Sequence, residues 1–384
     1  MCQTTNRLVP GLALGLILVL GACSDNNNNN GNSENPETGP DPVSIETPNA
    51  DRCEILDSEN CMFPWPSSAF TVSDDASVTG LRISLNRESM PANKQGVKVD
   101  VAEWNRNDGF SPSQMLLALV PGVDMEQTGA PPITDLEESL DPAAPVVVIR
   151  ASTGEQHLVF AELDANTDDP SQQTLIVRPM VQFERGERYI VALRNMRDAA
   201  GDLLEAPEVF RAFRDDTLTD NEAIEERRDA MEDIFATLAD AGIARDELYL
   251  AWDFTIASVE NITERVLHIR DDAFASLGNA APEFTVTEVV DLEPCSDSGC
   301  EEGQDAYKSR TITGTFEVPN YLNSDDGGPG VPFFYDQPDD GLPDRLGGDN
   351  MFTARFFCSV ARSVAEDFDA PPKAVARPSL YGHG

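Results

Sequence analysis

The stretch Leu248–Thr255, LYLAWDFT, has an apolar side chain at every second position. Alternate side chains of a strand point to the same face, so Leu248, Leu250, Trp252 and Phe254 share one face. An apolar run of this length is typical of a buried strand. We therefore expect this segment to lie in the core of the protein.

Helical patterns flank this strand on both sides. Upstream, Thr219 and Glu222 have the spacing of a capping box, and Gly242 follows the last periodic residue. The apolar stripe of the upstream helix is Ile224, Met231, Ile234, Phe235 and Leu238. The downstream helix is expected to begin near Ser258, and its stripe is Val259, Ile262, Val266, Ile269 and Ala273.

Short runs rich in Val, Ile and Leu precede the helices, and turn signals separate them. These predicted strands are APVVVIRA (144–151), HLVFAEL (157–163), QTLIVRP (173–179) and RYIVALR (188–194). Segment 175–213 resembles bacterial immunoglobulin-like repeats, with a Pro-bounded strand, a Gly turn, a Tyr-led strand and an Asp-x-x-Gly turn. This resemblance implies a β-rich, immunoglobulin-like domain.

The N-terminus carries the pattern of a lipoprotein signal. Arg7 precedes the apolar run Leu8–Leu20, which is too short to span a bilayer comfortably. The sequence Leu-Gly-Ala-Cys ending at Cys23 resembles the bacterial lipobox, which implies lipidation of Cys23 and, with Ser24 after it, sorting to the outer membrane. The expected location is the outer membrane, the cell surface or the periplasm. An ordinary cleaved signal with an incidental Cys23 is the alternative, but the polar, Asn-rich tail that follows is typical of a tether.

The charge balance excludes one large class of partner. The 384 residues include 68 acidic and 27 basic side chains, for a net charge of -41. Without a basic patch, nucleic-acid binding is not expected. An acid-rich surface with few lysines suits salty water, where self-repulsion is screened, and an ordinary soluble secreted protein is the alternative reading.

The cysteines indicate an oxidising compartment. Of seven cysteines, Cys2 leaves with the signal and Cys23 is taken by lipid. Two of the pairs that remain are close in sequence, and each could close a small loop as a disulfide: Cys53 with Cys61, and Cys295 with Cys300. Cys358 is then either a buried free thiol or the partner of a cysteine outside this sequence.

Several segments together resemble uncharacterised bacterial secreted proteins that carry an α/β-hydrolase domain. These segments are FPWPSSAFT (63–71), WNRNDGFSPSQ (104–114), LYLAWDFT (248–255), GTFEVPNYL (314–322) and LYGHG (380–384). In layout the proteins are related to the family whose N-terminal domain is named for bacterial virulence-factor lipases. The resemblance implies a β-rich domain before a hydrolase domain, and serine ester hydrolysis as the activity of the parent protein, with an ester or lipid as substrate.

The resemblance assigns a role to the end of the sequence. In α/β-hydrolases a His-Gly pair often follows the third strand, and a backbone N–H of that loop helps to form the oxyanion hole. His383 and Gly384 match this loop, behind predicted strands at Thr311–Val318, Phe352–Val360 and Val375–Leu380. His383 would shape the loop and would not be the triad histidine.

No Gly-x-Ser-x-Gly elbow occurs in the sequence. The nearest candidate is Gly109-Phe110-Ser111-Pro112-Ser113, which lacks the second glycine. His268 lies in a predicted helix and His157 in a predicted strand, and neither is expected to be catalytic. Because the triad members follow the oxyanion strand in chain order, we expect no catalytic residue here and interpret the sequence as a truncated product.

The predicted fold is mixed α and β: an immunoglobulin-like N-terminal domain with a helical pair, then the first strands of an incomplete α/β-hydrolase sheet. The expected parts are a signal peptide (1–22), a tether (23–50), the β-rich domain (51–216), a helix–strand–helix segment (217–290) and the hydrolase start (291–384).

An acidic loop suggests a second chemistry, since calcium prefers carboxylate and carbonyl oxygens on a tight turn. A faint candidate site is Asp336, Asp339, Asp340 and Asp344, although the spacing is not that of an EF-hand. No cofactor is expected. The competing function is a non-catalytic surface lipoprotein with an immunoglobulin-like binding module.

Overall fold

The computed structural model describes residues 41–57, 60–278, 280–296, 299–325, 327–328, 330–337, 340–348 and 350–381. The lipobox with Cys23, most of the tether, and the oxyanion-loop residues His383 and Gly384 therefore lie outside the described residues. The described part is mixed and strand-rich, with few helices and several small antiparallel sheets, as the sequence predicts.

The predicted core strand is confirmed as β8 (Leu248–Thr255). It lies at one edge of a three-stranded antiparallel sheet in the order β4 (Val146–Arg150), β7 (Arg188–Arg194), β8. Cross-strand partners share a face, so the pairs Tyr189–Phe254, Val191–Trp252 and Leu193–Leu250 form one continuous apolar layer.

A second three-stranded sheet shares this core. Its order is β3 (Leu116–Leu119), β6 (Thr174–Pro179), β5 (Val159–Leu163), and the buried residues of both sheets belong to one hydrophobic cluster. The predicted strands 144–151, 157–163, 173–179 and 188–194 thus correspond to β4, β5, β6 and β7.

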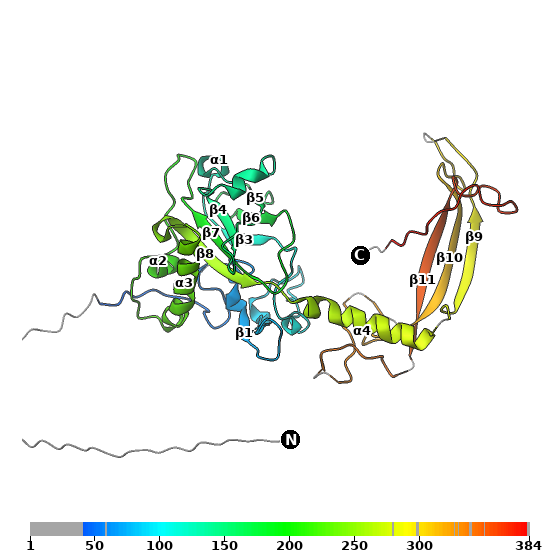
Figure 1. Ribbon diagram of the computed structural model, residues 1–384, viewed down its shortest axis with the longest axis horizontal. Helices are drawn as coiled ribbons and strands as arrows, with labels where there is room; N and C mark the ends of the chain where they lie inside the picture. The colour runs from blue at the N-terminus through cyan, green and yellow to red at the C-terminus, as the bar shows by residue number, and fades with distance from the viewer. Residues whose placement is uncertain are drawn as a thin grey trace, which may run out of the picture. The chain divides into compact units, whose positions relative to one another are not determined.

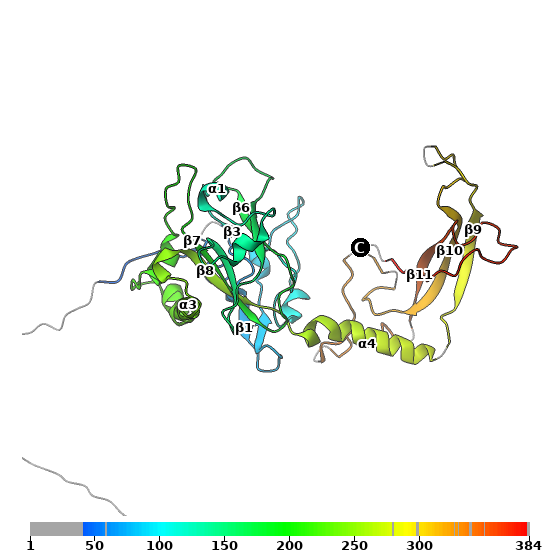
Figure 2. The ribbon, with the colours of Figure 1, turned by 45° about the horizontal axis from the view of Figure 1, so that its top comes forward.

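Two helices pack against β8 on the side away from the second sheet. In Figures 1 and 2, α2 (Glu208–Arg214) and α3 (Glu222–Asp240) lie beside β8 on the side away from β3 and β6. The predicted stripe of α3 is buried, from Ile224 to Leu238.

The predicted capping box of α3 is wrong in detail. Asn221 is the N-cap, and its side chain accepts hydrogen bonds from the backbone of Ala223 and Ile224. Thr219 instead donates to Glu225 at 2.7 Å. Together with the stronger hydrogen bond from Arg228, this bond lowers the pKa of Glu225 to about 2.

Two of the segments that carried the family resemblance, 63–71 and 104–114, pack against β8. The indole nitrogen of Trp252 donates to the carbonyl oxygen of Pro66 at 2.8 Å, and Trp252 is fully buried. Phe110 donates its backbone N–H to Thr255 at 2.9 Å. A Cβ on Gly109 would lie 2.5 Å from the backbone nitrogen of Ala257, so only glycine allows this approach. Gly109 is therefore a packing residue, and the serines beside it do not stand on a nucleophile elbow.

The remaining small elements complete this part of the chain. They are the hairpin β1 (Thr71–Ser73) and β2 (Leu81–Ile83), and the short helix α1 (Met125–Thr128).

The second predicted long helix is α4 (Val259–Leu277), and Ser258 caps it as expected. Its predicted stripe is not buried: Val259, Ile262 and Val266 are all exposed. No helix among the described residues combines the length and apolar content needed to cross a bilayer.

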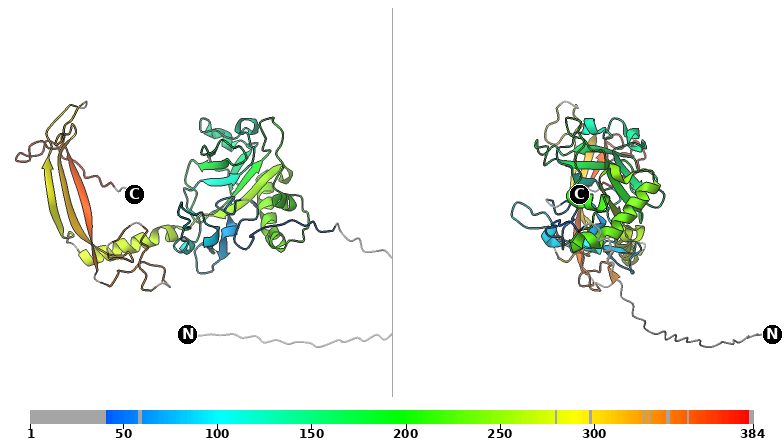
Figure 3. Two further views of the ribbon diagram at one scale, coloured as in Figure 1. Left: turned by 180° about the vertical axis from the view of Figure 1, so that it is seen from behind. Right: turned by 90° about the vertical axis from the view of Figure 1, so that its left-hand side faces the viewer.

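A third three-stranded antiparallel sheet follows α4, in the order β11 (Met351–Ala361), β10 (Lys308–Pro319), β9 (Phe284–Asp291). Its strands run side by side in Figure 3. The predictions for 311–318 and 352–360 are confirmed, β9 was not predicted, and the strand predicted at Val375–Leu380 is wrong. Val375 and Leu380 are fully exposed and pair with no described strand, so that segment lacks the ladder partner that would make it β structure.

We expect replacement of Trp252 by Phe to lower the free energy of unfolding by about 2 to 3 kcal/mol, because it leaves a small cavity and an unpaired carbonyl at Pro66. The matched control is Trp104→Phe, since Trp104 is 47% exposed, and it should stay within about 0.5 kcal/mol of wild type. Denaturant unfolding followed by far-ultraviolet circular dichroism measures both. Equal destabilisation by the two variants would contradict the central role of Trp252.

Candidate functional site

A cleft of about 280 Å³ opens where the first residues of β8 meet five other segments. Its apolar walls are Ile45, Ile55, Leu56, Leu119, Val209 and Leu250. Three prolines, Pro64, Pro121 and Pro207, add rigid apolar surface. Concave, largely apolar sites with a few polar groups are where small ligands bind, so this cleft is the candidate functional site.

Tyr249 supplies a polar group inside the cleft. It lies on the face of β8 opposite Trp252 and is 6% exposed. In the part of the chain that the structure describes, no residue forms a hydrogen bond with its hydroxyl. Burial, and secondarily the charge of Asp57, raise the pKa of Tyr249 to about 12. The phenol is therefore neutral at physiological pH and free to hydrogen-bond to a ligand.

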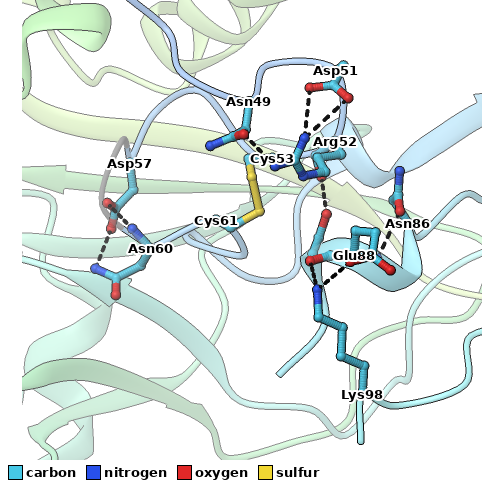
Figure 4. The surroundings of a disulfide bond; sticks show 11 residues. Asn49, Asp51, Arg52, Cys53, Asp57, Asn60, Cys61, Asn86, Glu88 and Lys98 are labelled. Carbon is cyan, nitrogen blue, oxygen red and sulfur yellow. Dashed lines mark hydrogen bonds and ion pairs between the residues drawn. A yellow bond between two sulfur atoms is a disulfide. The ribbon is translucent and has the colours of Figure 1, made fainter. Parts of the chain in front are cut away.

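One wall of the cleft belongs to a disulfide loop, which Figure 4 shows in close-up. The predicted Cys53–Cys61 disulfide is confirmed. Between the two cysteines lie Ile55, Leu56 and Asp57 of the cleft lining. The carboxylate of Asp57 accepts from the backbone of Asn60 at 2.9 Å and from its side chain at 3.3 Å, which closes the loop from within.

A buried ion pair holds the same loop against α3. Glu54 is 1% exposed, and its carboxylate pairs with Arg227 of α3 and accepts from the hydroxyl of Ser67. Removing one member of such a pair leaves an uncompensated buried charge, so the loop has one strongly preferred position. The cleft wall is preorganised by this pair and by the disulfide together.

The rim of the cleft is acidic. Glu46 and Glu208 are exposed on it, and Glu205 is paired with Arg211. Asp57 adds a further carboxylate beside Tyr249. None of the residues that line the cleft is Lys or Arg. The field at the mouth therefore favours a cation over an anion.

The predicted calcium loop uses its carboxylates for its own backbone. Asp344 accepts from the backbone N–H of Asp336 at 2.7 Å and of Gln337 at 3.1 Å. Asp340 accepts from Leu342 at 2.9 Å, and Asp339 lies outside the described residues. Within the described ranges, no group of three or more His, Cys, Asp or Glu side chains could hold a metal ion.

The two described histidines, His157 and His268, make contacts with residues other than serine. The Nε2 atom of His157 lies 3.0 Å from the carbonyl oxygen of Val181, and its ring stacks on that of Phe183 with 4.5 Å between the ring centroids. Burial lowers the pKa of His157. His268 lines a separate shallow depression near Asp272 and Arg345. No described serine forms a hydrogen bond with either histidine.

The second predicted disulfide, Cys295–Cys300, is also confirmed. Cys358 is a free thiol on β11, and it is exposed, so its interpretation as a buried thiol is wrong. Its alternative, a partner cysteine outside this sequence, remains a prediction.

The sequence contained little that pointed to the cleft. Its lining comes from segments near residues 45, 56, 64, 120, 207 and 249, which no spacing rule connects. The local feature that pointed to the cleft was Tyr249, because its side chain has a polar hydroxyl and the strand around it is almost entirely buried. Comparisons with protein families, with curated proteins and with solved structures find no match for this chain.

We expect the double variant Cys53→Ala/Cys61→Ala to lose about 2 to 3 kcal/mol of unfolding free energy, because the unfolded chain regains loop entropy. The matched control is Cys295→Ala/Cys300→Ala, because neither of these cysteines belongs to the hydrophobic cluster. All three tryptophans lie between residues 65 and 252, so tryptophan fluorescence during guanidinium unfolding reports on the part that holds the cleft. A larger loss in the control variant would contradict the proposed anchoring of the cleft wall.

Proposed function

We propose that this chain is the N-terminal portion of a secreted, lipid-anchored serine ester hydrolase. In this proposal an immunoglobulin-like, β-rich region precedes the first strands of an α/β-hydrolase sheet, and the triad lies elsewhere in the parent protein. The observation that carries the proposal is the uncovered apolar face of the β9–β10–β11 sheet.

Cross-strand pairing places most of the apolar side chains of that sheet on one face. Partners across the ladder share a face, which places on it Phe284 with Phe316, Val286 with Gly314 and Phe356, and Val289 with Ile312 and Cys358. The other face is richer in polar residues, namely Thr285, Glu288, Thr311, Thr313, Thr315 and Arg355, and it also carries Val290, Met351 and Phe357.

This apolar face has no cover among the described residues. Phe284 is 66% exposed and Val289 is 50% exposed. A sheet with one apolar face is stable when another layer packs on it, and exposed apolar patches of this kind mark interfaces. A Cβ on Gly314 would collide with the carbonyl oxygen of Thr285 and with the ring of Phe356, so glycine at this position lets that ring lie across β10.

The edges of the sheet support the same proposal. β9 and β11 each pair with β10 on one side, and the sheet contains no further described strand. Unpaired edges of long strands are a liability unless another strand or layer meets them. The first strands of a larger hydrolase sheet would have this property.

Among the described residues, neither His157 nor His268 is placed as the base of a triad with Ser111 or Ser113. Acyl transfer needs a nucleophile, a base hydrogen-bonded to it and a group that orients the base. His157 is held by Val181 and Phe183, and the hydroxyls of Ser111 and Ser113 have no histidine beside them.

We expect residues 23–384 to show no turnover of short-chain nitrophenyl esters. The coding sequence downstream of codon 384 should contain Gly-x-Ser-x-Gly followed by Asp and His. The product that includes it should hydrolyse these esters, and Ser→Ala at the elbow should abolish that activity. Esterase activity of residues 23–384 that survives Ser111→Ala and Ser113→Ala would contradict the proposal.

The lipid anchor is tested separately. If Cys23 is lipidated, Cys23→Ser should move the protein from the membrane fraction to the soluble fraction, because the acyl chains that hold it are lost. Cys2→Ser is the matched control, since Cys2 belongs to the predicted signal peptide, and it should stay in the membrane fraction. Identical soluble fractionation of wild type and Cys23→Ser would count against the anchor.

The second candidate function is binding by a non-catalytic surface lipoprotein. The preorganised cleft beside Tyr249 favours it, since the cleft is complete within the described residues and needs no triad. The two candidates differ in one observable: the first requires an elbow serine downstream, and the second does not.

A further inference from the structure

We propose that the cleft beside Tyr249 binds a linear aliphatic amine, with the alkyl chain against the apolar walls and the ammonium group at the acidic rim. This inference goes beyond the proposed hydrolase function and does not depend on it. It rests on the shape of the cleft, on the buried phenol and on the sign of the rim charges.

The alkyl chain is selected by the walls. Six aliphatic side chains and three prolines surround a volume of about 280 Å³, which suits a slender apolar group. Burying apolar ligand surface there favours binding. The walls are held by the Cys53–Cys61 disulfide and by the Glu54–Arg227 pair, so little ordering is needed on binding.

The ammonium group is selected by the polar atoms. Tyr249 is 6% exposed and lines the cleft, and its hydroxyl forms no hydrogen bond within the described part of the chain, so its oxygen can accept one from an ammonium N–H. Asp57 lines the same cleft, so a carboxylate and the Tyr249 side chain face one cavity. A cation next to both groups would be neutralised by Asp57 while it bonds to Tyr249.

The carboxylates at the rim of the cleft also favour a cationic ligand. Glu46 and Glu208 are exposed carboxylates at the mouth, and no hydrogen bond or ion pair engages either side chain within the described residues. A carboxylate ligand such as a fatty acid would meet three negative side chains, Glu46, Asp57 and Glu208, without a basic residue in the lining. Charge therefore separates an alkyl amine from a fatty acid of the same length.

The test is isothermal titration of residues 23–384 with n-octylammonium, n-octanol and n-octanoate. We expect n-octylammonium to bind at least about tenfold more tightly than n-octanol, a difference of about 1.4 kcal/mol. n-Octanoate should be the weakest. Raising the salt concentration should weaken n-octylammonium and leave n-octanol unchanged, because the rim charges are screened.

Variants separate the charge from the cavity. Glu46→Gln/Glu208→Gln should weaken n-octylammonium about fivefold to tenfold and leave n-octanol unchanged. The matched control is Glu137→Gln/Glu138→Gln, which removes two exposed acids outside the cleft, and it should change neither affinity. Tyr249→Phe should weaken n-octylammonium severalfold. Leu119→Trp should abolish binding of both ligands by filling the cleft, and circular dichroism checks that each variant is folded.

Three outcomes would overturn the proposal. The first is no binding of n-octylammonium at millimolar concentration to a folded wild-type chain. The second is n-octanoate binding as tightly as n-octylammonium. The third is an equal effect of the rim and control variants. None of these outcomes bears on ester hydrolysis, because the hydrolase proposal is tested by the elbow serine and not by this cleft.

Discussion

The buried indole of Trp252 fixes the positions of several segments that pack around β8. Trp252 is fully buried in the middle of β8, and its N–H needs a partner because an unpaired buried donor costs about 1 to 3 kcal/mol. The partner is the carbonyl of Pro66, so segment 63–71 must cross this strand. That crossing sets the position of the Cys53–Cys61 loop, since Ser67 of the same segment bonds to Glu54 inside the loop. The cleft wall is thus positioned by a contact made at the core.

The segments that carry the family resemblance are explained by this packing. Trp65 contacts Phe110 edge-on at 5.1 Å, and Asp108 accepts from the backbone N–H of Ser258 at 3.0 Å, where α4 begins. Segments 63–71, 104–114 and 248–255 therefore meet one another, and their residues serve packing and helix capping. Residues with these roles carry no information about substrate.

Two apolar surfaces of the chain differ in character and in the function that they suggest. The β9–β10–β11 face is broad and contributed by three neighbouring strands, which suits a protein layer. The cleft beside Tyr249 is small, rigid and rimmed by carboxylates, which suits a small cationic ligand. A lipid-anchored enzyme could carry both, because the layer would complete the fold while the cleft stays accessible to ligand.

Local periodicity in the sequence determined the strands β4 to β8, the buried stripe of α3 and the Ser258 cap, because these patterns depend on neighbours within a few residues. The short loops between cysteines determined both disulfides in the same way. The cleft, the exposure of α4 and the failure of Val375–Leu380 to form a strand were decided by tertiary structure. Each depends on which distant segment lies alongside, and a strand or an apolar stripe without such a partner gains neither ladder hydrogen bonds nor burial.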